Sequence, residues 1–227
     1  MNGGNVIDTQ HTTVLAISRQ LGSGGSLIGQ EVAKRLGFSY FDRDILHRAA
    51  ESLGVDEAGL APLEERSETF WERLAPPFLL GVTGGPIMPA MPLYTAGSEL
   101  FAAERGIIQS IAARGNAVIV GRGGVHVLSS HPGLVAVFVH APESFRVRRL
   151  MEAFGIATVE EATELVRRSD KQRSEFHKSL THHQWTDASM YDVCVNTDAV
   201  GLGEATDVVA GIVAARMGAV QRRKINS

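Results

Sequence analysis

The chain has 227 residues, of which 44% are apolar, 21% charged and 6% aromatic, the composition of a single ordinary globular domain over residues 1–227. This composition excludes a solenoid, a collagen-like chain and a disordered tail. With 22 Lys and Arg against 25 Asp and Glu, the net charge is -3, so no excess positive field exists to bind nucleic acid, and we expect no such partner.

Neither export nor membrane insertion is expected. Residues 1–13 lack the basic start and apolar core of a signal peptide. Residues 74–98 carry no charge but contain five prolines, which forbid a continuous spanning helix. The one cysteine, Cys194, cannot form an intrachain disulfide and lies in an apolar run, where we expect it to be buried. A cytoplasmic location is the expectation.

Strand and helix patterns alternate along the chain. Short apolar runs rich in valine predict strands at 14–17, 117–120, 134–139 and 193–195, and a weaker aromatic run predicts one at 38–41. Helical patterns lie between them, at 26–36, 42–53, 99–114, 142–154, 158–180 and 204–217. We therefore expect an α/β fold with five parallel strands joined by right-handed crossovers. The order of the strands is not visible in the sequence.

A glycine-rich turn follows the first predicted strand and opens a helix. Glycines let the backbone approach a ligand closely, and the amides at a helix N-terminus favour an anion, so phosphate is the expected ligand. Against the P-loop pattern G-x-x-x-x-G-K-[ST], Gly24 and Ser26 match, but Arg19 replaces the first glycine and Gly25 the lysine. If ATP binds here, arginines must supply the missing charge.

Two alternatives compete for this turn. Gly22-x-Gly24, with Asp42 at a distance suited to a ribose hydroxyl, favours a dinucleotide, but the third glycine of that fingerprint would fall at Leu27. No tyrosine of the chain has a lysine four positions later, so the chemistry of a short-chain dehydrogenase is missing. The other alternative is a tight turn with a purely structural role.

Several arginines follow the later strands. Arg122 comes directly after the strand at 117–120, and Arg146 and Arg149 share one face of the next long helix. The following charged helix carries a further group, Arg167, Arg168, Asp170 and Arg173. Fixed cations around a migrating phosphoryl group are the main catalytic need of phosphoryl transfer. Each arginine taken singly could instead form a surface ion pair, as Asp170 and Arg173 could with each other.

These motifs, in this order, resemble the cytidylate kinase-like family of P-loop nucleoside monophosphate kinases. The matching segments are 17–26, Tyr40-Phe41-Asp42-Arg43, Val120-Gly121-Arg122-Gly123, His140-Ala141-Pro142, Asp170-x-x-Arg173, Trp185-x-Asp187 and 191–197. The resemblance implies a five-stranded parallel sheet, an ATP site, an acceptor-binding insert at about 55–98 and a lid at about 154–186.

The resemblance also implies roles for individual residues. Those expected at ATP are Arg19, Gly22, Ser23, Gly24, Gly25 and Ser26, with Ser26 also at Mg²⁺. Asp42 and Arg122 are expected to bind the acceptor, and Arg122, Arg146, Arg168 and Arg173, with Asp170 orienting them, to surround the transferring phosphate. Authentic cytidylate kinases have lysine where this chain has Gly25, and an Arg-Asp pair where it has Arg122-Gly123.

The leading hypothesis is a kinase that moves the γ-phosphoryl group of Mg-ATP to a nucleoside monophosphate, most simply CMP or dCMP. The alternative is a catalytically weak nucleotide-binding module with a sensor or partner role. Gly25 favours this alternative, whereas the retained Ser26, Arg122 and Arg173 oppose it. The uncharged stretch at 74–98 makes a homodimer possible. His177, His182 and His183 are expected to be solvated lid residues and not metal ligands.

Overall fold

The structure is a computed structural model that describes residues 12–42, 99–180 and 184–225. Residues 43–53 of the predicted helix at 42–53, the predicted insert at 55–98, and His182 and His183 lie outside the described residues. No helix in the described ranges is long and apolar enough to cross a membrane.

Five parallel strands form one sheet in the order β2-β3-β1-β4-β5. Their bounds are Val14–Arg19 for β1, Ser39–Phe41 for β2, Ala117–Val120 for β3, Leu134–His140 for β4 and Val193–Asn196 for β5. All five predicted strands are confirmed. The central strand β1 is almost fully buried, as expected for a valine- and isoleucine-rich strand covered on both faces.

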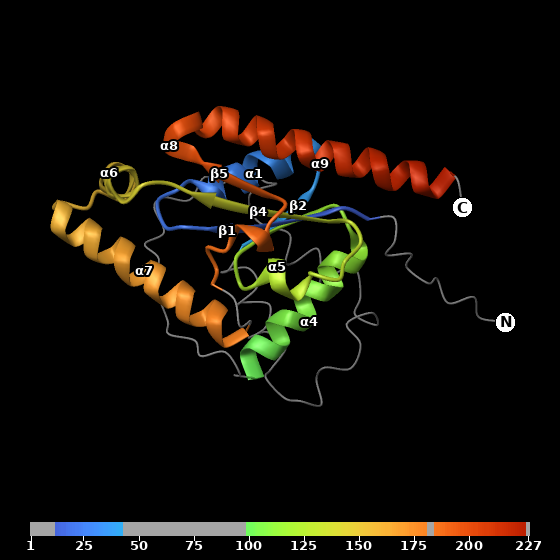
Figure 1. Cartoon of the computed structure of the whole chain (residues 1–227), viewed down its shortest axis with the longest axis horizontal. Coiled ribbons are helices and arrows are strands. Elements are labelled where there is room, and N and C mark those ends of the chain that lie inside the picture. Colours follow the sequence, from blue (N-terminus) through green and yellow to red (C-terminus); the bar gives the residue numbers. More distant parts are fainter. Residues whose placement is uncertain (1–11, 43–98, 181–183, 226–227) are drawn as a thin grey trace.

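Helices cover both faces of the sheet (Figure 1). Their bounds are Gly25–Leu36 for α1, Glu99–Arg114 for α4, Gly124–Val127 for α5, Glu143–Phe154 for α6, Val159–Leu180 for α7, Thr197–Val200 for α8 and Leu202–Ile225 for α9. A 3-10 turn, η5, spans Ala188–Met190. The helices α1 and α9 lie on one face, and α4, α5 and α7 lie on the other.

The alternation of side chains along the strands divides the core into these two layers. Leu15 and Ile17 of β1 pack with α1 and α9, whereas Val14 packs with Ile107 and Ile111 of α4. Successive residues of a strand point to opposite faces, so one strand supplies both layers. The parallel sheet therefore places the carboxyl ends of β1, β3 and β4 side by side, and the predicted site lies at this end of the strands.

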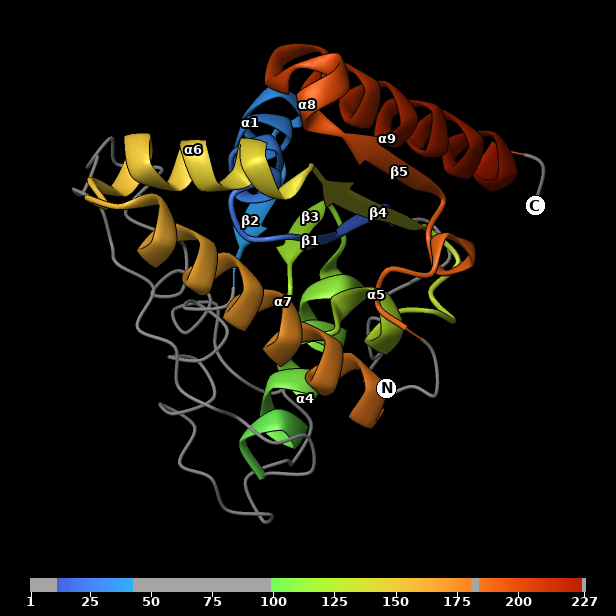
Figure 2. The ribbon, with the colours of Figure 1, turned by 60° about the vertical axis from the view of Figure 1, so that its left-hand side comes forward.

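Local signals explain where the helices begin and end. The helix α1 ends at Gly37, whose φ of 68° is left-handed and whose amide bonds to the Ala33 carbonyl. The helix α7 follows Thr158, whose hydroxyl accepts a hydrogen bond from the Glu161 amide at 3.2 Å, half of the predicted capping box. From its contact with α6 this helix runs towards the start of α4, where Phe176 meets Phe101 edge to face (Figure 2).

One burial prediction is wrong. Cys194, expected inside the protein, is exposed. The strand β5 is at the edge of the sheet, where Val195 packs into the layer with α9 while its neighbour Cys194 points to the other, less covered face.

Candidate functional site

The glycine-rich turn joins the end of β1 to the start of α1, and hydrogen bonds to the end of β4 fix it in place. The amide of Gln20 bonds to the Val139 carbonyl at 3.0 Å, and the Gln20 side chain accepts from the Ala141 amide at 3.2 Å. Ser23 is fully buried, and its hydroxyl donates to the carbonyls of Gln20 (2.8 Å) and Val139 (3.1 Å). The turn is thus preorganised, and Ser23 can offer a ligand its backbone amide but not its hydroxyl.

Two glycines of this turn have conformations and neighbours that no other residue would accept. Gly22 and Gly24 have left-handed φ angles of 80° and 87°. A Cβ at Gly22 would lie 2.7 Å from the carbonyl oxygen of Arg146, and a Cβ at Gly24 would lie 2.6 Å from the Nη1 atom of Arg149. The backbone of α6 and the guanidinium of Arg149 therefore sit directly against the turn.

Arg149 lies directly against the glycine turn, although it was not among the predicted site residues. Its Nη1 atom is buried and has no hydrogen-bond partner within the described residues. Burial lowers the pKa of Arg149, with the charge of Glu152 acting in the opposite direction. A buried donor without an acceptor is costly, so this N–H beside the N-terminus of α1 fits an anionic oxygen. The i, i+3 spacing from Arg146 was the available sequence signal.

Arg122 lies in a tight left-handed turn after β3. The φ angles of Gly121, Arg122 and Gly123 are 86°, 52° and 68°, the middle one an uncommon conformation for a non-glycine residue. The guanidinium is buried, and its Nε donates to the carboxylate of Glu104 on α4 at 2.6 Å. The ring of Phe176 from α7 lies 5.0 Å from its centre. Glu104, which is fully buried, was also missed from the sequence.

Arg146 ties the glycine turn to the predicted lid. The residue is only 4% exposed, and its guanidinium donates hydrogen bonds to the carbonyls of Ala141 (2.9 Å) and Leu21 (3.3 Å). It also pairs with Asp170 of α7 at 2.9 Å. Asp170 thus fixes the position of the Arg146 guanidinium, which in turn supports the glycine turn through the Leu21 carbonyl. Contact of Arg146 with a transferring phosphate stays a prediction.

The other two predicted lid arginines differ in their surroundings. The Nη1 atom of Arg173 is buried, and its charge is close enough to lower the pKa of His177. Arg168 is exposed, on the side of α7 away from the buried Val166 and Ser169. The structure brings Arg173 towards the sheet and leaves Arg168 in solvent.

Asp42 and Ser26 lie around the end of β2. Burial, and next the charge of Asp42, raise the pKa of Tyr40, which places that carboxylate near the Tyr40 ring. Ser26, in the first turn of α1, is also close enough to act on the Tyr40 hydroxyl. Because β2 pairs with β3, Asp42 and the Arg122 turn both follow the carboxyl ends of neighbouring strands. Binding of an acceptor by these two residues stays a prediction.

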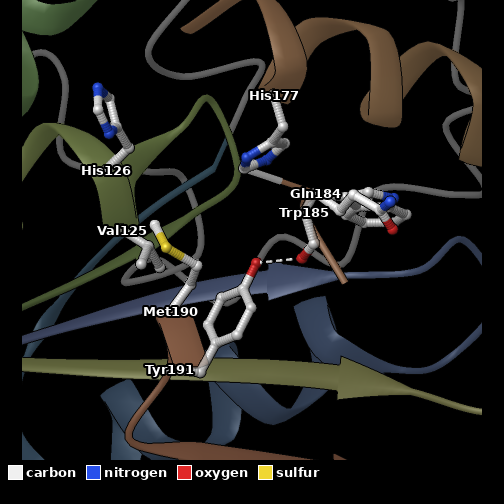
Figure 3. A pocket seen from close by; sticks show the side chains of 7 residues that line it. All are labelled: Val125, His126, His177, Gln184, Trp185, Met190 and Tyr191. Carbon is white, nitrogen blue, oxygen red and sulfur yellow. Dashed lines mark hydrogen bonds between the residues drawn. The ribbon is translucent and has the colours of Figure 1, made fainter. Parts of the chain in front are cut away.

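A small pocket opens beside α7, on the face of the sheet that carries α5 (Figure 3). It is lined by Val125, His126, His177, Gln184, Trp185, Met190 and Tyr191. The Tyr191 hydroxyl donates to the Trp185 carbonyl at 2.5 Å, and Phe138 of β4 packs against both rings. His177, predicted to be solvated, points into this pocket because α7 turns that face towards the sheet.

His177 should make stability depend on pH. Burial, and then the charges of His126, Arg173 and Arg19, lower its pKa from 6.5 to about 4. The folded protein thus keeps the ring neutral where the unfolded chain takes up a proton. This contribution is complete above pH 6.5 and is lost as pH falls from 6.5 to 4, by about 3 kcal/mol in total. His177→Gln should reduce the loss of unfolding free energy between pH 7 and pH 4.5, measured by denaturant titration; an equal loss would contradict the assignment.

Solved structures with a similar fold include two kinases and an uncharacterized protein. An uncharacterized protein from Eubacterium ventriosum ATCC 27560 has a TM-score of 0.65 and 20% identity, covering 89% of this chain and 98% of its own. The chain is also similar to a gluconokinase from Sinorhizobium meliloti 1021, with a TM-score of 0.50 and 15% identity over 94% of this chain and 98% of the gluconokinase. A shikimate kinase from Bacteroides thetaiotaomicron has a TM-score of 0.50 and 14% identity over 89% of this chain and 99% of its own. No curated protein sequence matches the chain.

The fold is therefore that of the P-loop kinases, with the predicted parallel sheet confirmed. Fold and family together support a kinase-type enzyme. The model of the cytidylate kinase-like family matches residues 14–199, which is most of the chain, so the protein belongs to the cytidylate kinase-like family.

Proposed function

We propose that the protein transfers the γ-phosphoryl group of ATP to a nucleoside monophosphate, with CMP and dCMP as the first acceptors to test. The observation that carries the proposal is the preorganised glycine turn at the N-terminus of α1, against which lies the buried Nη1 of Arg149, an atom with no hydrogen-bond partner in the part of the chain that the structure describes. An array of amides and one unsatisfied cationic donor matches a phosphate chain.

In this reaction an oxygen of the acceptor phosphate forms a bond to the γ-phosphorus while the bond to the β-phosphate oxygen breaks, and ADP leaves. The acceptor oxygen is already largely deprotonated at neutral pH, so no protein base is needed. The protein positions the two substrates and offsets their charge. The turn and Arg149 would hold the donor, and Asp42 and Arg122 mark the acceptor side.

The residues present fit a Mg²⁺ ion only in part. Ser26 occupies the P-loop position whose hydroxyl binds the ion, and it lies next to the amide array. No group of three His, Cys, Asp or Glu side chains that could hold a metal occurs in the described ranges. Magnesium, which neutralises phosphate charge in such reactions, would thus be held by Ser26, phosphate oxygens and water.

The alternative is a nucleotide-binding module with little catalysis. The replacement of lysine by Gly25 favours it, since one fixed cation of the usual loop is missing from its usual position. Retention of Ser26 and the placement of Arg149 favour the kinase. The two proposals differ in turnover, not in binding of ATP.

The test compares two adjacent arginines of α6. Arg149→Ala should lower kcat/KM for ATP by about tenfold to a hundredfold, the effect of losing a charge-assisted hydrogen bond. Arg148→Ala is the matched control, because this side chain is exposed beside Phe145 and should change little. ADP formation is measured with CMP, dCMP, UMP, AMP and GMP as acceptors.

Melting experiments separate the two functions. A ligand at about a hundred times its dissociation constant adds about 2.7 kcal/mol, which should raise Tm by roughly 5 to 11 °C. A rise with Mg-ATP and one monophosphate, together with turnover, supports the kinase. A rise with ATP but no turnover with any monophosphate supports the module, and no rise with any nucleotide contradicts both.

A further inference from the structure

The two residues that depart from the P-loop pattern, Arg19 and Gly25, are in contact with each other. The pattern has glycine at its first position and lysine at its seventh, where this chain has Arg19 and Gly25. A Cβ at Gly25 would lie 2.6 Å from the Cβ and 3.1 Å from the Cγ of Arg19, with Val139 at 3.3 Å on another side. Position 25 must therefore be glycine because the stem of Arg19 fills the space where a lysine side chain would begin.

A second glycine accommodates the other end of the same side chain. A Cβ at Gly121, after β3, would overlap the Nη1 atom of Arg19 and lie 2.9 Å from its Cζ. The stem of Arg19 thus starts against the first turn of α1, and its guanidinium reaches the turn that carries Arg122. Two glycines from separate loops leave space for the side chain of Arg19. This packing indicates that the Arg19 side chain has a defined conformation in the fold and is not a freely rotating surface group.

We propose that Arg19 supplies, from the opposite end of the loop, the cation that lysine supplies in the usual P-loop, with the β- and γ-phosphates of a nucleoside triphosphate as its ligand. The inference rests on the proposed function. Because its stem begins beside Gly25, its head group can reach the region that a lysine from that position would reach. A guanidinium adds a planar fork that can bind two phosphate oxygens at once.

Substitutions at positions 19 and 25 should have non-additive effects on Tm and on the affinity for triphosphate. Gly25→Lys should not improve the protein but lower its Tm and its affinity for triphosphate, since the new Cβ meets Arg19. In the Arg19→Gly background the same change should be tolerated and should recover affinity. The double variant Arg19→Gly/Gly25→Lys should therefore bind ATP at least tenfold more tightly than Arg19→Gly alone.

A variant that keeps the packing tests the charge by itself. Arg19→Met retains a long apolar stem against Gly25, so its Tm without ligand should stay close to that of the unaltered protein. Its affinity for Mg-ATP and for inorganic tripolyphosphate, measured by calorimetry, should fall about tenfold to a hundredfold. Arg148→Met, on an exposed arginine of α6, is the matched control and should bind both ligands unchanged.

A ligand-free measurement tests the steric part. Gly25→Ala should lower Tm in the unaltered background but much less in the Arg19→Gly background. If the unaltered protein binds ATP and tripolyphosphate and Arg19→Met binds them equally well, the assignment of Arg19 fails while the proposed function stands. If the unaltered protein binds neither, both fail together. A gain of affinity in Gly25→Lys alone would also overturn the assignment.

Discussion

Glu104→Gln should lower the free energy of unfolding by about 3–5 kcal/mol, because it removes the buried carboxylate that neutralises Arg122. Glu104 has no exposed surface and Arg122 is 9% exposed, so water cannot solvate the guanidinium once the charge is lost. The left-handed φ of 52° at Arg122 adds strain that the surrounding contacts must offset. Urea titration measures the change.

The pair should also show strong coupling. Arg122→Met leaves Glu104 uncompensated and should be similarly destabilising, whereas Glu104→Gln/Arg122→Met should cost much less than the sum of the two single changes. Glu31→Gln is the matched control, since Glu31 pairs with Arg35 on the exposed face of α1 and its loss should have little effect. Additive single effects would show that the two side chains do not stabilise each other.

Arg146→Ala should damage both stability and phosphate binding. The side chain connects the end of β4, the glycine turn and α7 through Ala141, Leu21 and Asp170, so its removal frees the turn and leaves a partly buried carboxylate. We expect a loss of about 2–4 kcal/mol of unfolding free energy. Catalytic efficiency should fall at least a hundredfold, since small displacements of a positioned site are costly.

The matched control for this change joins the same two helices. Arg167 of α7 pairs with Glu143 of α6 at 2.8 Å, but their side chains are 66% and 42% exposed. Arg167→Ala should therefore leave stability and kinetics almost unchanged. Equal effects of the two substitutions would contradict the bracing role of Arg146. A normal ATP KM in Arg146→Ala would show that the turn keeps its shape without the brace.

The strands were predictable because each is a short, nearly continuous apolar run, the pattern of a strand buried on both faces. Their order was not, because it depends on pairings such as Val14 with Ala117, which lie far apart in the chain. The four-residue helices α5 and α8 have too few residues to show a helical period. Cys194 is exposed because β5 is an edge strand. This exposure could not be predicted without knowledge of the strand order.

The turn between β1 and α1 was predictable from its setting, a glycine-rich segment between an apolar run and a helical pattern, whereas phosphate binding there stays a prediction. Glu104 was missed although a signal existed: it lies on the buried stripe of α4 with Phe101, Ile108 and Ile111, where a lone carboxylate needs a partner. The contact between Arg19 and Gly25 was not readable, because the sequence gives the two replacements but not their distance.

The strand order has a consequence for how the protein folds. The strands β2 and β3 are neighbours in both sequence and sheet, as are β4 and β5, so each couple can form without the other. The central strand β1 joins the two couples, and its pairings, of Val14 with Ala117 and with Leu134, are longer-range than those within either couple and so are expected to form late. We therefore expect β1 to dock last between two preformed halves. The glycine turn that follows β1 would then acquire its shape in that final step. If the turn binds phosphate as proposed, phosphate added during refolding should favour completion of the sheet.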